Sequence, residues 1–217
     1  MDALMEELLE APDLPRKLQV LNEAFAREQA RRERFYEEMT PYQRVEFING
    51  QVIMHSPAKW RHGESMGLIY MLLASHVNRH KLGKAAMEKI LVTLTRNDYE
   101  PDVLFFGPEK AAQITPDQTK FPAPDFVAEV LSPSTEHRDR GVKKQDYAAH
   151  GVGEYWIVDP VEQHIEQHQL HGTHYHLVGT RRADETITSL VVPGFSMPVL
   201  AAFDADANVA ELAAVLR

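Results

Sequence analysis

Apolar and polar residues follow each other in patterns that predict short strands and longer helices in mixed order. Val45 to Met54 form two apolar-rich runs around Asn49-Gly50, a dipeptide typical of tight hairpin turns. Residues 61–80 carry apolar side chains at helical spacing, which predicts an amphipathic helix. Similar patterns predict strands at 87–95, 103–106, 126–131, 155–158 and 186–192, helices at 136–150 and 208–216, and a hairpin at 164–179. The chain therefore mixes both kinds of element, with the second hairpin toward its C-terminal end.

The first 39 residues have the pattern of a helical arm ahead of this mixed region. Large apolar residues recur at steps of four, three and four, which gives one apolar stripe. The stripe consists of Leu14, Leu18, Leu21 and Phe25. Thr40-Pro41 then breaks the helical pattern. We therefore predict an arm at 1–39, which packs on the domain or on a partner subunit, and one domain at 40–217. Contact with DNA through the arginines between 27 and 34 is less favoured, because glutamates are interleaved with them.

Composition narrows the class of protein. The chain has 217 residues, 44% of them hydrophobic, which is enough for a sizeable core. It has no cysteine, which excludes disulfides and thiolate metal sites. The longest apolar run, around Met66 to Ala74, is too short to span a membrane, and a cytoplasmic location is expected. The net charge of -9 argues against general binding of polyanions but permits a local basic patch.

One charged residue, Glu129, interrupts the apolar run from Phe126 to Leu131. Charges are rarely buried without a partner. If 103–106 and 126–131 pair antiparallel, Asp102 lies beside Glu129, and Asp125 lies at the far end with a structural role. Two such carboxylates repel each other, and a divalent cation would relieve that repulsion. A protonated or arginine-paired glutamate is an equally simple interpretation, and a parallel crossover between the strands also remains open.

Several segments resemble one known family. They are VEFINGQVIMHSP, RHGES, EPDVLFFG and PDFVAEVLSPST, followed by RDRGVKKQDYAAHGVGEYWIVDP. Over about residues 40–203 the chain resembles the Uma-two family of putative restriction endonucleases, a branch of the PD-(D/E)XK nuclease superfamily. The resemblance implies a restriction-endonuclease-like α/β fold with a mixed central β-sheet flanked by helices. It also implies hydrolysis of nucleic-acid phosphodiester bonds with Mg²⁺ or Mn²⁺.

The resemblance places the metal-binding carboxylates on Asp102 and Glu129, in agreement with the reasoning from the strands. The superfamily lysine would lie two residues after the glutamate, where this chain has Leu131. The family pattern then assigns that lysine to Lys143, on the following helix. Lys143 would neutralise the attacked phosphate or orient the attacking water.

Weaker candidates surround this core. Glu46 and His62 occupy family-like positions and would complete the site or contact phosphate, and Tyr147 could pack along the stem of Lys143. A basic cluster that would hold nucleic acid, or would simply form a solvated helix face, consists of Arg138, Arg140 and Lys144. Five histidines crowd the hairpin between 164 and 176. They raise the idea of a zinc or nickel site, although histidines that face solvent are the favoured interpretation.

These observations predict a Mg²⁺- or Mn²⁺-dependent endonuclease that acts on DNA, with duplex DNA as the favoured substrate, as a homodimer without membrane association. The alternative is a catalytically inactive nucleic-acid-binding or interaction module on a nuclease fold, which Leu131 supports. A histidine-rich metal-binding protein is the third possibility.

Overall fold

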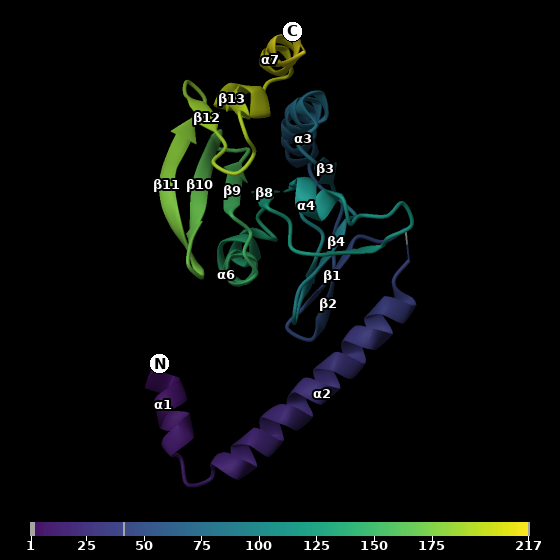
Figure 1. The fold of residues 1–217 in the computed structure, drawn as a ribbon, viewed down its shortest axis with the longest axis vertical. Helices are drawn as coiled ribbons and strands as arrows, with labels where there is room; N and C mark the ends of the chain where they lie inside the picture. Colours follow the sequence, from purple (N-terminus) through teal and green to yellow (C-terminus); the bar gives the residue numbers. More distant parts are fainter. Residues whose placement is uncertain (1–2, 41, 217) are drawn as a thin grey trace.

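The computed structural model describes residues 3–40 and 42–216, and it begins with two helices that extend away from the rest of the molecule (Figure 1). These are α1 (Ala3–Glu10) and α2 (Leu14–Glu38). Buried residues of α2 are confined to its C-terminal part, namely Glu28, Arg32 and Phe35. Arg32 donates hydrogen bonds to both carboxylate oxygens of Asp98, at 2.7 and 2.8 Å, and fastens this part of the helix to the domain.

The apolar stripe of α2 does not pack on the described part of the domain. Leu18, Leu21 and Phe25 are 46%, 53% and 52% exposed. Packing of the stripe on a partner subunit stays a prediction. The division of the chain at residue 39 also stays a prediction, and the contacts of Arg32 cross it.

Two sheets form the body of the molecule, which matches the predicted mixed α/β architecture. The five-stranded sheet has the order β2-β1-β5-β4-β7, and the six-stranded sheet has the order β11-β10-β9-β8-β6-β3. The strands of the first are β1 (Val45–Ile48), β2 (Gln51–Met54), β4 (Leu91–Thr93), β5 (Asp98–Tyr99) and β7 (Lys120–Phe121). Those of the second are β3 (Lys84–Met87), β6 (Val103–Phe106), β8 (Phe126–Val130), β9 (Glu154–Asp159), β10 (His164–His171) and β11 (His174–Arg182). Within the larger sheet β8 and β9 pair in parallel, and the other neighbouring strands pair antiparallel.

Helices and short elements complete the fold (Figure 1). They are α3 (Trp60–His80), α4 (Pro108–Ala111), α5 (Glu136–Arg138), a π-helical turn (Asp139–Lys143), α6 (Lys144–Ala149), β12 (Thr186–Thr188), β13 (Ser196–Pro198), a 3₁₀ turn (Val199–Ala202) and α7 (Ala205–Val215). None of the helices in the described part of the chain is long and apolar enough to cross a membrane.

Alternation along β6 and β8 sends their side chains into two separate cores. Val103, Phe126 and Ala128 pack with α3 and the C-terminal segments. Leu104 and Val127 pack on the other face, with the five-stranded sheet and α6. Because side chains alternate along a strand, Asp102 and Glu129 belong to this second face. The six-stranded sheet thus directs both carboxylates toward the five-stranded sheet.

The predicted strand at 87–95 is wrong as a single element. β3 ends at Met87 in the six-stranded sheet, and β4 starts at Leu91 in the five-stranded sheet. Between them, Glu88 and Lys89 have φ values of 38° and 48°. This left-handed backbone turns the chain out of one sheet and into the other. By contrast, the predicted turn at Asn49-Gly50 is confirmed, with positive φ at both residues and β1 paired to β2.

The predicted C-terminal hairpin is confirmed as β10 and β11, at the edge of the six-stranded sheet. Its histidines do not all face solvent. His171, His174 and His176 are exposed at the tip, whereas His168 is only 3% exposed and packs against aromatic rings. Within residues 3–40 and 42–216, no group of three or more His, Asp or Glu side chains is placed to hold a metal ion, so the hairpin shows no formed metal site.

Candidate active site

Asp102 and Glu129 lie beside each other in the six-stranded sheet. β6 and β8 are antiparallel with Val103 opposite Ala128, and one further step along this register brings Asp102 next to Glu129. Opposed residues of such a pair point to the same face. Both residues are 2% exposed. The predicted antiparallel pairing is therefore confirmed.

Both oxygens of Asp102 are engaged. Oδ2 accepts a hydrogen bond from the backbone N–H of Val130 at 2.8 Å. Oδ1 lies 2.6 Å from a guanidinium nitrogen of Arg44 and 3.4 Å from Nε2 of His62. Arg44 also pairs with Glu88 at 3.0 Å. Burial alone would raise the pKa of Asp102, but His62 and Arg44 outweigh it and hold that pKa well below its usual range.

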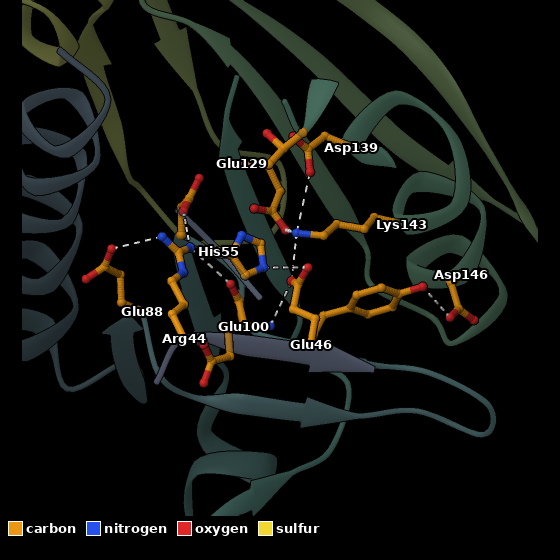
Figure 2. A network of polar contacts seen from close by, with 12 residues as sticks. Arg44, Glu46, His55, Glu88, Glu100, Glu129, Asp139, Lys143 and Asp146 are labelled. Carbon is orange, nitrogen blue, oxygen red and sulfur yellow. Dashed lines mark hydrogen bonds and ion pairs between the residues drawn. The ribbon is translucent and has the colours of Figure 1, made fainter. Parts of the chain in front are cut away.

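Glu129 shares its partner Lys143 with two other carboxylates. The ammonium of Lys143 lies 3.0 Å from Glu129, 2.9 Å from Glu46 and 3.4 Å from Asp139, in the centre of the network in Figure 2. The hydroxyl of Tyr147 donates to Glu129 at 2.9 Å. Both hydrogen bonds reach Oε1, so Oε2 is the oxygen that a ligand could take. Burial raises the pKa of Glu129 and Asp102 adds to the shift, while Lys143 offsets only part of it.

A π-helical turn brings the residues around Lys143 together. The helix predicted at 136–150 is interrupted from Asp139 to Lys143, where each turn holds more residues than in an α-helix. Asp139, Lys143 and Tyr147 are all buried on the side of Glu129, whereas Lys144 is half-buried. Four surrounding carboxylates raise the pKa of Lys143 well above its usual value, although burial opposes this. The surrounding carboxylates therefore favour the charged form of Lys143.

The five-stranded sheet supplies a third carboxylate, Glu46. Glu46 is fully buried. Its Oε2 lies 3.0 Å from Nε2 of His55, and its Oε1 is the oxygen that contacts Lys143 (Figure 2). Burial disfavours its charge, but Lys143 and His55 lower its pKa to about 2. Nearby, burial raises the pKa of Glu100 to about 7, with Arg44 opposing and Glu46 adding to the shift. The site is thus assembled from residues on both sheets and on the helix after β8.

A cavity of about 420 Å³ opens over Asp102 and Glu129. Basic residues at its wall are Arg44, Lys59, Arg61, Arg138 and Lys143. The predicted basic cluster is divided by the fold. Arg138 lines the cavity, whereas Arg140 forms ion pairs of 2.8 Å with Glu136 and Glu166, and Lys144 does not reach the cavity wall.

The acidic surplus around the cavity is compatible with a divalent cation. Buried carboxylates are Glu46, Glu100, Asp102, Glu129 and Asp139. Two basic side chains, Arg44 and Lys143, pair with members of this group. Because no three-ligand cluster exists among the described residues, a cation would rest on Asp102 and Glu129, with water and a substrate phosphate as further ligands. Mg²⁺ is commonly held in this way.

The sequence did not point to Arg44, His55 or Asp139 as members of the site. A signal for Arg44 was present, because Arg44 directly precedes β1 and is two residues from Glu46, the spacing at which extended residues share a face. The Asn49-Gly50 turn also fixes the hairpin register, and the backbone N–H of His55 donates to the carbonyl of Arg44 at 3.0 Å. Asp139 could be found only as a helical neighbour of Lys143, because the two residues are four apart and both are buried in the π-helical turn.

Comparisons with known proteins agree with this architecture. A crystal structure of a putative nuclease belonging to DUF820 from Anabaena variabilis has a TM-score of 0.62, with 18% sequence identity. The match covers 73% of this chain and 89% of that one, and at this identity it supports the fold alone. No curated protein matches the chain significantly. The sequence profile of the Uma2 family, described as putative restriction endonuclease, matches residues 32–201. With most of its length matched, the chain belongs to the Uma2 family.

Proposed function

We propose that the protein is a Mg²⁺- or Mn²⁺-dependent endonuclease that cleaves DNA. The observation that carries the proposal is the juxtaposition of Asp102 and Glu129 on the floor of a cavity with Lys143 bound to Glu129. Membership of a restriction-endonuclease-like family supports hydrolysis of phosphodiester bonds as the reaction.

Each residue has a defined task in this proposal. Oδ1 of Asp102 and Oε2 of Glu129 would hold the metal ion, and Arg44 would withdraw toward Glu88 to make room. The bound cation would stabilise negative charge on the phosphate and lower the pKa of a coordinated water. Lys143 orients Glu129 and offers its charge to the attacked phosphate. Tyr147 fixes the rotamer of Glu129 through its hydroxyl.

The test is single-turnover cleavage of duplex DNA with Mn²⁺, combined with calorimetric titration of Mn²⁺ without DNA. Glu129→Gln should abolish both cleavage and metal binding, because a site with only two protein ligands depends on the negative charge of both carboxylates. Asp125→Asn is the matched control, because Asp125 precedes the same strand and its carboxylate pairs with Lys110 at 2.7 Å. Binding of DNA without any cleavage by the wild-type protein would instead support the inactive-module alternative.

The proposal includes a homodimer, because cutting both strands of a duplex needs two sites. The half-exposed stripe formed by Leu18, Leu21 and Phe25 supports it, since the described part of the same chain leaves that stripe uncovered. Light scattering during size-exclusion chromatography checks the mass. A monomer at micromolar concentration would contradict the dimer and leave the proposed chemistry untouched.

A further inference from the structure

An exposed tryptophan lies in the chain between two basic residues that line the cavity, although it is not itself part of the cavity wall. Lys59 and Arg61 line the cavity at the start of α3, and Trp60 lies between them with its side chain 82% exposed. The chain has only two tryptophans, and the other, Trp156, is fully buried in the core. A large aromatic side chain that is exposed to solvent, next in the chain to two cations of the cavity wall, is suited to a ligand with both aromatic and anionic parts.

Polar atoms inside the cavity also lack hydrogen-bond partners. His62 is 8% exposed, its Nε2 pairs with Asp102 at 3.4 Å, and its Nδ1 has no hydrogen-bond partner among the described residues. Nε of Arg138, on the wall that faces α3, is likewise unsatisfied within the described part of the chain. Buried polar groups usually find partners, so these donors indicate where the anionic part of a ligand would bind.

We infer that Trp60, Lys59 and Arg61 form a subsite for an unpaired nucleotide of the strand whose phosphate enters the cavity. Inside a duplex, stacking covers both faces of each base, so away from the duplex ends an exposed indole can stack only on a base that has left the helix. A phosphate must also approach Asp102 and Glu129, which are 2% exposed, and a strand free of its complement can bend into the cavity. This inference rests on the proposed function and names its substrate class: DNA with unpaired nucleotides beside the scissile bond.

Binding can be tested in EDTA, where cleavage is blocked, by tryptophan fluorescence. Single-stranded oligothymidylate should quench the emission of the exposed Trp60 and leave that of the buried Trp156 unchanged. An oligonucleotide with abasic sugars has the same phosphates without bases and should not quench. Trp60→Leu should remove the response and weaken binding about 5- to 150-fold, the range for loss of one stacked base, while Trp60→Phe should lose less.

The basic residues have their own matched control on the same helix. Lys59→Gln and Arg61→Gln should each lower the slope of log affinity against log salt by about 0.7 for a single strand. Arg79→Gln, at the opposite end of α3, should leave the slope unchanged, because Arg79 does not line the cavity. Equal effects of all three variants would mean a diffuse charge effect and would overturn the subsite.

Cleavage separates this inference from the proposed function. With Mn²⁺, a duplex that carries a single-stranded tail or gap should be cut faster than a blunt, fully paired duplex, and Trp60→Leu should remove the difference. Equal cutting of both substrates, with Trp60→Leu as active as wild type, would overturn the subsite and keep the nuclease. Base-dependent quenching by the tail without cutting of any substrate would keep the subsite and overturn the nuclease.

Discussion

Replacement of Lys143 by methionine tests whether the charge of this lysine stabilises the buried carboxylates when no metal is bound. Lys143 is 2% exposed, and its ammonium lies within 3.4 Å of three carboxylates. Removing one partner of a buried ion pair costs about 3–5 kcal/mol, because the remaining charges stay buried and uncompensated. For a chain of this size, 1 kcal/mol corresponds to roughly 2–4 °C in Tm, so the expected decrease in EDTA is roughly 6–20 °C.

The matched control is Lys144→Met, which removes the adjacent, half-buried lysine. Lys144 takes no part in the ion pairs that join Lys143 to Glu46, Glu129 and Asp139, so the expected change is within about 0.5 kcal/mol. Thermal unfolding followed by circular dichroism measures both variants, and Mn²⁺ should restore part of the loss in Lys143→Met. An unchanged Tm for Lys143→Met in EDTA would refute this reasoning. It would mean that the carboxylates around Lys143 are neutralised by protonation and do not need the lysine. Cleavage by this variant must be assayed below its own Tm.

Three further changes probe other parts of the molecule. Asp102→Ala should lower the free energy of unfolding in EDTA by about 2–4 kcal/mol, because Arg44 loses its nearer carboxylate; repulsion between carboxylates alone predicts the opposite sign. Arg32→Met should cost about 3–5 kcal/mol and expose α2 to limited proteolysis, because Asp98 is fully buried. His168→Gln should reduce the loss of stability between about pH 7 and pH 5. Burial and then Lys144 lower the pKa of His168, so the unfolded chain takes up the proton first as the pH falls through about 6.5.

Each of these three has a result that would contradict it. A higher Tm for the alanine variant at Asp102 would mean that repulsion outweighs its pairing with Arg44. Arg34→Met, on an exposed residue of the same helix, is the control for Arg32, and equal losses in both would argue against the ion pair. Identical pH dependence of urea unfolding in wild type and His168→Gln would assign the acid sensitivity elsewhere. Charged or titratable groups around His168 are Glu166, Lys144, Arg140, Tyr155 and Tyr175.

The sequence pointed to Asp102 and Glu129 because the alternation of side chains along a strand and the position of strand ends can be read from local sequence. Glu129 is conspicuous in an apolar strand, and Asp102 precedes another apolar strand, so pattern made the two candidates; the antiparallel pairing that joins them was one of two open arrangements, and the structure confirms it. Lys143 was predicted chiefly through the family resemblance. Lys143 lies at the end of a π-helical turn. The sequence did not predict that turn, because the same residues would also fit an α-helix.

The remaining features that the sequence did not predict depend on contacts between distant parts of the chain. The run 87–95 has strand-like composition throughout, and its break falls at Glu88 and Lys89, neither of which is glycine, so the left-handed backbone there gave no signal. The stripe on α2 was correctly periodic, but periodicity does not say what covers an apolar face. The burial of Arg32 against Asp98 joins residues 66 positions apart and could not be derived from local pattern.

The pairing of Arg44 with Asp102 and of Lys143 with Glu129 bears on how the protein matures in the cell. Many small metal-dependent domains remain unfolded until their ion arrives, because their ligands repel one another without it. Here the chain carries its own cations for that purpose, so a newly synthesised molecule can complete folding before it meets any metal. If the protein is the metal-dependent nuclease proposed above, biosynthesis and activation are separate events, and the supply of metal would set how much protein is active without deciding how much is folded.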